Sequence, residues 1–160
     1  MKSYTNQITI TEKSEHELTT DEKQLLEAAK HATYNSYSPY SHFSVGAALR
    51  LDNGEIIIGS NQENCAYPSG LCAERTAVFA ANATHPDNAV VSICIAARDT
   101  HGEFTQMPIT PCGACRQVLL ETEQRFNKKI SIMLYGTKGT YIIDSAKDLL
   151  PVSFDASYLI

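Results

Sequence analysis

The chain has 160 residues, of which 43% are hydrophobic and 19% are charged, a balance that excludes a disordered protein and fits a single folded domain. The formal net charge of −5, without any run of Lys or Arg, argues against a dedicated binder of nucleic acid or of an anionic membrane. The sequence shows no signal-peptide core, no apolar run near the roughly 18 residues of a membrane span and an odd number of cysteines, five, so we expect a cytoplasmic protein with free thiols.

A first helix is predicted to begin at Thr19. Thr19 and Glu22 have the spacing of a capping box, and an apolar stripe follows as far as Ala32. Ahead of this helix, Ile8 and Ile10 alternate with polar residues. That pattern fits either a short edge strand or an unstructured arm, and the sequence does not decide between them.

Two strands joined by a tight turn are predicted next. Apolar and polar residues alternate over 43–51, the turn falls at 52–54, and a returning strand covers 55–59. The returning strand has a continuous apolar run, which predicts burial on both of its faces. After an irregular polar stretch, a second helix is expected from about Cys72.

The rest of the chain alternates between strands and helices. We expect a central strand over 90–96, a helix from about Cys112, strands over 129–134 and 140–143, and a short terminal helix as far as Leu150. The order α-β-β-α-β-α-β-β-α predicts an α/β protein with three layers, α/β/α, and a five-stranded mixed sheet. Residues 20–160 are expected to form one domain, with residues 1–19 as an N-terminal extension of unassigned role.

Two short cysteine motifs lie at predicted helix N-termini. They are Cys72-Ala73-Glu74-Arg75 and Pro111-Cys112-Gly113-Ala114-Cys115-Arg116. In an open α/β sheet the loops that follow strands collect at one edge, where helix N-termini favour thiolates. Three thiolates suit Zn²⁺, and catalytic zinc takes three protein ligands and keeps a fourth position for water. Cys72, Cys112 and Cys115 are therefore candidate ligands of a catalytic zinc.

Charged residues in the same motifs suit catalysis at such a metal. Glu74 lies two residues after Cys72, where it can reach a water on the zinc and move a proton from it. Zn²⁺ with three thiolates carries a net charge of about −1, which raises the pKa of bound water. Arg75 and Arg116 are the last residues of the two motifs. Hydrogen bonds from these arginines to the cysteine sulfurs would offset that negative charge.

Other interpretations of the cysteines stay open at this point. The Cys112–Cys115 pair alone matches a thioredoxin-like redox dithiol, although such a pair needs no distant Cys-x-Glu. Cys65, in the irregular stretch, is available as a fourth ligand that would close the zinc site into a structural one. Cys94 lies in an apolar strand and is interpreted as a core residue. The five histidines show no metal-ligand spacing.

The order Cys-x-Glu followed by Pro-Cys-x-x-Cys matches the zinc deaminase signature, in which the Glu is not a metal ligand. The chain resembles the small homotetrameric zinc-dependent cytidine deaminases that act on free nucleosides. The resemblance spans about residues 20–155 and rests on the segments Ser38–Ala48, Asn61–Asn64, Cys72–Ala77 and Pro111–Gln117.

For the metal centre, the resemblance implies zinc as the cofactor and Cys72, Cys112 and Cys115 as its ligands. It implies that Glu74 is the catalytic proton shuttle and that Arg75 neutralises thiolate charge. The implied reaction is hydrolytic deamination of cytidine and deoxycytidine to uridine and deoxyuridine, by a zinc-bound hydroxide, with release of ammonia in pyrimidine salvage.

For the substrate, the resemblance implies that Phe43 lies beside the pyrimidine and that Asn61 and Glu63 hold ribose hydroxyls. Ala73 is placed in the same substrate-binding set, and Phe154 is expected to reach into the site of a neighbouring subunit. These residue types suit the tasks, since an Asn and a carboxylate two apart on an extended segment face the same side and Phe offers a flat apolar wall. The alternatives are a turn role for Asn61 and core packing for Phe43 and Phe154.

The expected partners are a nucleoside and further copies of the chain in a homotetramer, with no nucleic acid and no membrane. Rival functions are a blasticidin-type antibiotic deaminase, a deaminase of bases within RNA or DNA, a non-catalytic zinc protein and a redox dithiol. The nucleic acid option is disfavoured because a polyanion needs clustered Lys and Arg. Three features depart from the family pattern: residues 1–19, the long loop 98–110 and Cys65.

Overall fold

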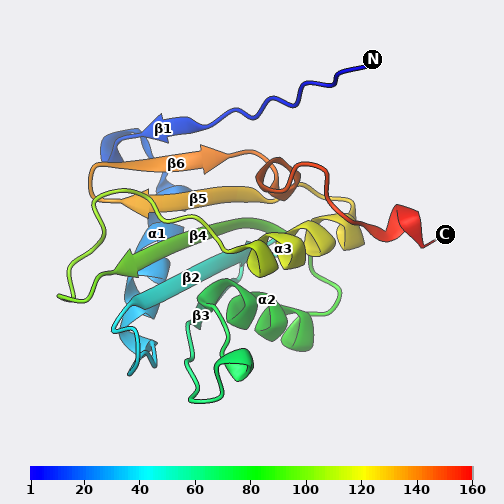
Figure 1. Cartoon of the computed structure of the whole chain (residues 1–160). Coiled ribbons are helices and arrows are strands. Elements are labelled where there is room, and N and C mark those ends of the chain that lie inside the picture. Colours follow the sequence, from blue (N-terminus) through cyan, green and yellow to red (C-terminus); the bar gives the residue numbers. More distant parts are fainter. Residues whose placement is uncertain (160) are drawn as a thin grey trace.

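A computed structural model describes residues 1–159 and contains one mixed sheet of six strands in the order β1-β6-β5-β4-β2-β3 (Figure 1). The strands are β1 (Thr11–Lys13), β2 (Ser44–Leu51), β3 (Ile56–Ser60), β4 (Val90–Arg98), β5 (Ser131–Gly136) and β6 (Gly139–Ile143). The α-helices are α1 (Thr20–Ala32), α2 (Ala73–Thr84) and α3 (Gly113–Phe126). Among the described residues, no helix combines the length and the apolar content of a membrane span.

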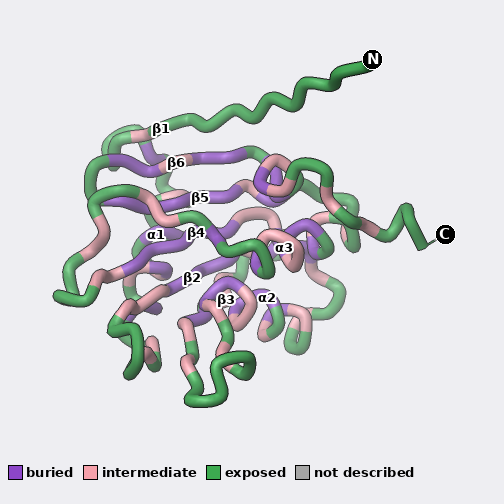
Figure 2. The backbone as a smooth tube through the Cα atoms, viewed as in Figure 1, coloured by how far each residue is buried: buried purple, intermediate pink, exposed green. Residues whose placement is uncertain are grey.

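Helices cover both faces of the sheet, with α1 on one face and α2 and α3 on the other (Figure 1). On the first face, Leu25 of α1 belongs to a buried cluster with Met133 of β5. On the second face, Ala77 of α2 and Leu119 of α3 belong to a cluster with Ile95 of β4. Figure 2 shows the central strands buried and the loops and termini exposed. The predicted three-layer α/β/α fold is confirmed.

The sheet has six strands where five were predicted, because residues 11–13 pair with β6 as an additional edge strand. Thr11 lies opposite Ile142, and Lys13 lies opposite Thr140, in antiparallel register. The sequence left an edge strand open, but the residues that pair lie just after the alternating Ile8 and Ile10. The pairing depends on a partner near the other end of the chain, which a local pattern does not reveal.

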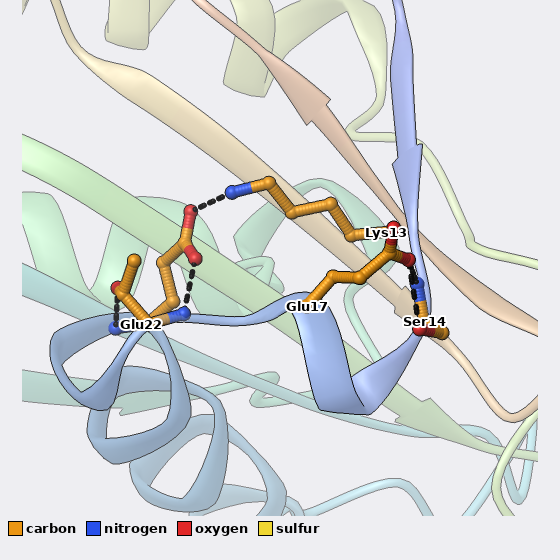
Figure 3. Close-up of polar contacts among 5 residues, drawn as sticks. Lys13, Ser14, Glu17 and Glu22 are labelled. Atoms are coloured by element: carbon orange, nitrogen blue, oxygen red, sulfur yellow. Dashed lines mark hydrogen bonds and ion pairs between the residues drawn. The ribbon is translucent and has the colours of Figure 1, made fainter.

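Two consecutive capping boxes connect β1 to α1 (Figure 3). The backbone N–H and the hydroxyl of Ser14 donate to the Glu17 carboxylate at 2.8 and 2.7 Å. The N–H of Thr19 donates to Glu22 at 2.8 Å, and the N–H of Glu22 donates back to Thr19 Oγ1 at 3.2 Å. Glu22 also pairs at 2.8 Å with Lys13, the last residue of β1. The helix start at Thr19 is thus confirmed.

One local prediction was wrong, and a second was confirmed in its place along the chain but not in its helix type. The returning strand β3 is not buried on both faces, because Ile58 is 40% exposed. In the described sheet β3 is the outermost strand and pairs only with β2, so its neighbours cover it incompletely. The predicted terminal helix is a single 3₁₀ turn, Ala146–Leu149.

The strand directions place two helix N-termini at one edge of the sheet. Both β3 and β4 run antiparallel to β2, so their carboxyl ends lie at the same edge. The chain enters α2 after β3 and α3 after β4. Gly59 of β3 lets α2 pack closely, since a Cβ there would lie 2.5 Å from the Ala73 carbonyl oxygen and 2.4 Å from the Ala77 nitrogen. The fold therefore brings the starts of α2 and α3 together.

Candidate metal centre and substrate pocket

The two helix starts assemble three cysteines. Cys72 is the N-cap of α2, Cys112 is the N-cap of α3, and Cys115 follows in the first turn of α3. The Cys72 and Cys112 sulfurs are 3.7 Å apart, the Cys112 and Cys115 sulfurs 3.5 Å, and all three lie within 4.8 Å of one another. Tetrahedral Zn–S bonds of about 2.3 Å place sulfurs roughly 3.8 Å apart, so the cluster fits zinc.

The other two cysteines lie apart from this cluster. Among the described residues, the group of side chains able to hold a metal contains Cys72, Cys112 and Cys115 and not Cys65. Cys65 is exposed, and its thiol donates to Asn64 Oδ1 at 3.7 Å. Cys94 is fully buried in β4, in the core position expected for it, and burial raises the pKa of its thiol.

The surroundings of Cys72 favour the thiolate form of this residue. The hydrogen bond with Cys115 and then that with Arg75 lower the pKa of Cys72 to about 5, against the opposing effect of burial. Arg75 Nη2 donates to the Cys72 sulfur at 3.8 Å, which is the contact that the sequence suggested. The positive ends of α2 and α3 act in the same direction. A cation that prefers sulfur therefore finds Cys72 as a thiolate, whereas the hydrogen bond with Cys72 and then burial raise the pKa of Cys115, whose proton the metal must displace.

Arg116 does not take the place suggested for it. Its Nε donates to the Pro111 carbonyl and its Nη1 to the Leu149 carbonyl, both at 2.8 Å. Its described hydrogen bonds therefore go to carbonyl oxygens and none goes to a sulfur. Arg116 fastens the entry of α3 to the 3₁₀ turn near the C-terminus, a long-range contact that adjacency to the cysteine motif could not indicate.

Glu74 is the buried acid beside the cysteines. It lies in the first turn of α2, it is only 4% exposed, and it lines the same cavity as Cys72 and Cys112. Burial raises the pKa of Glu74 above the ordinary value of a carboxyl group, which favours its protonated form. A carboxyl group of this kind can accept a proton and return it.

A cavity of about 720 Å³ opens next to the cysteines, within the usual size range of small-molecule sites. Phe43 and Ala73, both singled out from the sequence, line it. Phe43 is half-buried and Ala73 is fully buried. An aromatic ring and a small residue give the cavity an apolar wall suited to a flat heterocycle.

Asn61 and Glu63 also line the cavity, and each is held by the segment 36–45. Asn61 Oδ1 accepts from Ser36 Oγ at 2.6 Å and from the Val45 N–H at 2.8 Å, while its Nδ2 donates to the Phe43 carbonyl at 2.9 Å. Asn61 therefore has a structural role whether or not it also binds a ligand. Its amide orientation is fixed, with one N–H left over.

The Glu63 carboxylate accepts from the backbone N–H groups of Tyr40 at 2.9 Å and Ser41 at 3.2 Å. Hydrogen bonds from these two residues lower the pKa of Glu63. The side chain is thus a fixed anion at the cavity, with acceptor capacity to spare.

Phe154 lies outside this cavity. It is 59% exposed, and its ring stacks on Tyr158 with centroids 5.5 Å apart. Gln117 of α3 donates to its carbonyl at 3.0 Å and ties the segment to the domain. Within one chain Phe154 is neither a core residue nor a wall of its own pocket.

Other residues that line the cavity were not singled out from the sequence, among them two tyrosines and two residues of the loop before α3. Tyr40 and Tyr67 form an edge-to-face pair at 6.0 Å, and Ile109 and Thr110 supply the wall that precedes Cys112. Tyr40 lies in one of the segments that carry the resemblance, which was an available signal. Ile109 and Thr110 lie in the long loop, whose course the sequence does not specify.

A model of the cytidine and deoxycytidylate deaminase zinc-binding region matches residues 19–132, more than half of the chain. The chain belongs to this deaminase family. It is 38% identical over 136 residues to a cytidine deaminase of Halalkalibacterium halodurans, covering 85% of this chain and 96% of that one. It is 39% identical over 141 residues to a cytidine deaminase of Sporosarcina psychrophila, covering 86% and 96%.

Solved structures of cytidine deaminases share the fold. That of Burkholderia pseudomallei superposes with a TM-score of 0.72 at 39% identity, covering 86% of this chain and 100% of that one. That of Mycobacterium tuberculosis gives a TM-score of 0.64 at 34% identity, covering 86% and 99%. The predicted family, its α/β/α fold, a zinc-dependent deaminase activity and zinc as cofactor are confirmed, against the alternative of a redox dithiol.

Proposed function

We propose that this deaminase hydrolyses cytidine and deoxycytidine to uridine and deoxyuridine, with release of ammonia, and that it serves pyrimidine salvage. The observation that carries the proposal is the buried Glu74 in the wall of a cavity that is also lined by Cys72 and Cys112 of the three-cysteine cluster. An acid in that place can serve a hydrolysis whose proton transfers must occur away from bulk water.

Zinc held by Cys72, Cys112 and Cys115 would lower the pKa of a water molecule and so supply the nucleophile. Glu74 takes a proton from that water and gives it to N3 of the pyrimidine, which makes C4 more electrophilic. Once the oxygen of that water has bonded to C4, Glu74 takes the second proton from this oxygen and gives it to the amino group, whose bond to C4 breaks as ammonia leaves. The balance is one cytidine and one water to one uridine and one ammonia.

In this proposal Asn61 and Glu63 bind the sugar through hydrogen bonds. Asn61 has a single free N–H donor, and Glu63 offers an acceptor oxygen. One donor and one acceptor together match a single hydroxyl group, which accepts one hydrogen bond and donates another. A sugar with one such hydroxyl is enough, which supports deoxycytidine as a substrate beside cytidine.

The charge of the cavity favours a nucleoside over a nucleotide. Among the described lining residues, Arg75 is the one Lys or Arg side chain, and its guanidinium is engaged with Cys72. Glu63 adds a negative charge that would repel a phosphate. Binding of a phosphate normally uses a cluster of Arg or Lys or an open helix N-terminus, and the α2 and α3 N-termini here carry the cysteines.

A substrate panel tests the proposal. We expect the zinc-loaded protein to convert cytidine and deoxycytidine with kcat/KM values within about tenfold of each other, because losing a contact outside the Asn61–Glu63 pair costs about 1.4 kcal/mol or less. CMP, dCMP and blasticidin S are expected to react at least about a hundredfold more slowly. The ultraviolet loss of the cytidine chromophore measures each rate. Faster turnover of a monophosphate or of the antibiotic would contradict the proposal.

We also propose a homotetramer in which Phe154 reaches into the pocket of a neighbouring subunit. Its exposure, its stacking on Tyr158 and its tether to Gln117 support this, since together they present an ordered aromatic pair to the outside. The edge strand β3, with its exposed Ile58, adds apolar surface that a partner copy would cover.

Replacing Phe154 by Ala is expected to raise KM for cytidine about tenfold, although Phe154 lies outside the cavity of its own chain. Tyr4→Ala, at another exposed aromatic residue, in the N-terminal arm, is the control and is expected to leave KM unchanged. Mixed oligomers of Phe154→Ala and Glu74→Gln chains are expected to recover activity above the sum of the two, because each supplies what the other lacks. A monomer by light scattering, or no recovery on mixing, would contradict the arrangement.

We propose a cytoplasmic location, since three of the five free cysteines meet in a thiolate cluster that an oxidising compartment would endanger. We propose, too, that residues 20–160 carry the deaminase domain and that residues 1–19 are an extension. Its strand β1 covers the edge of β6.

A further inference from the structure

The loop that delivers Cys112 rests on the β5–β6 turn. This loop leaves β4 after Arg98 and runs to the start of α3. The N–H of Thr137 donates to the Thr105 carbonyl at 3.0 Å, and the N–H of Lys138 donates to the Gln106 carbonyl at 3.1 Å. Two backbone hydrogen bonds therefore anchor the middle of the loop to the tip of a hairpin in the sheet.

Directly before that tip, the loop backbone touches Gly136, the buried last residue of β5. A Cβ on Gly136 would lie 2.6 Å from the Gln106 carbonyl oxygen, 2.6 Å from the Pro108 nitrogen and 2.7 Å from the Met107 carbonyl carbon. All three are backbone atoms, which cannot rotate aside as a side chain can. Any other residue at 136 must therefore push the segment 106–108 away from the sheet.

The displaced segment leads straight into the site. Ile109 and Thr110 follow it and line the cavity, and Cys112 comes two residues later. We propose that Gly136 is a positioning residue of this deaminase: its missing side chain fixes the loop wall of the substrate pocket and the approach of Cys112 to the metal. Gly136 lies outside the family motifs quoted above and does not line the cavity. The inference rests on the proposed function in taking this cavity as the cytidine pocket.

The same hairpin supplies a matched control. Gly139 is the cross-strand partner of Gly136 on β6. A Cβ there would lie 2.4 Å from Glu12 Oε1 and 3.1 Å from Glu12 Cγ, which belong to an exposed, flexible side chain able to move away. Gly136→Ala and Gly139→Ala thus make the same chemical change at the two ends of one turn, and only the first presses on the loop.

The test compares these two variants in the full-length protein. Gly136→Ala is expected to raise KM for cytidine about tenfold or more, because displacing a pocket wall by a fraction of an ångström to about 1 Å has effects of that order. It is also expected to release zinc to a chelating dye at a lower dye concentration than the parent protein does. The kcat per bound zinc should fall less than KM rises, since Glu74 lies on α2 and not on the loop. Gly139→Ala should match the parent within about twofold in each measurement.

Equal KM values and equal zinc affinities in the two variants would overturn the proposal, as would a loss in Gly136→Ala that is confined to Tm. If Gly136→Ala does not fold, Thr137→Pro removes one anchoring hydrogen bond without adding a Cβ at 136, and it must then show the same pattern. Neither Thr137 nor Lys138 has a positive φ, which would bar a proline from position 137. A parent protein without activity on cytidine would refute the proposed function instead, and the zinc comparison would still decide the role of Gly136.

Discussion

Glu74→Gln is expected to bind one zinc per chain, as the parent protein does, and to lose cytidine turnover by a factor of at least roughly 10²–10⁴, the range attributed to general acid–base catalysis. The amide keeps the size of the carboxyl group in a site that is only 4% exposed, so packing is preserved. It can neither accept a proton from water nor pass one to the pyrimidine. Zinc content, Tm and the ultraviolet assay on one preparation give all three quantities.

Glu121→Gln is the matched control for this prediction. Glu121 is exposed on α3 and does not line the cavity, so the same change there should leave turnover and zinc content unaltered. If the turnover of Glu74→Gln is within tenfold of that of the parent protein, Glu74 does not carry out the proton transfers. The deaminase would then need another group for them, and no second buried acid lines the cavity among the described residues.

The parts of this site that depend on local chemistry were predictable. The capping box at Thr19 marked the start of α1, and the change from loop to apolar periodicity marked the starts of α2 and α3. Cys72 and Cys112 are the N-caps of those two helices. Because strand order and direction in α/β sheets follow general rules, the sequence predicts two helix N-termini at one edge of the sheet, where their cysteines can meet.

The parts that depend on distant partners were not predictable. Arg116 follows its cysteine motif just as Arg75 does, yet it donates to the Leu149 carbonyl, which no local spacing could reveal. β1 forms only because β6 offers it a free edge, and Ile58 is exposed because β3 is the last strand in the order. The contact of Gly136 with the loop also depends on a distant partner. The need for glycine at this position is visible only when the position of the facing backbone is known.

The sequence allowed two interpretations of Asn61. The family resemblance assigns it to the sugar, and the alternative was a turn residue. In the structure its Oδ1 accepts from Ser36 Oγ and from the Val45 N–H, and its Nδ2 donates to the Phe43 carbonyl. The two interpretations are compatible, because the same hydrogen bonds that fix the segment also decide which atom remains for a ligand. Its role toward the sugar stays a prediction until the substrate panel is measured.

Cys115→Ser is expected to weaken zinc binding at least about a hundredfold and to lower activity in proportion to the zinc that is lost. A serine hydroxyl is a harder and far less acidic ligand than a thiol, so it does not replace sulfur on zinc. Cys115 is fully buried, and its sulfur lies 3.5 Å from the Cys112 sulfur. Zinc content after dialysis against a chelator, and the Tm with and without added zinc, provide the measurement.

Cys65→Ser shows whether the loss of zinc and activity in Cys115→Ser reflects a catalytic or a structural zinc site. If three sulfurs hold the metal and leave room for water, this exposed cysteine is irrelevant, and the variant should match the parent in zinc content and in kcat. If Cys65 instead moved in as a fourth ligand, its replacement would also lower zinc affinity, and a closed site would have no position at which Glu74 could assist a water. Retention of zinc and turnover in Cys65→Ser, beside their joint loss in Cys115→Ser, therefore separates a catalytic centre from a structural one without reference to any relative.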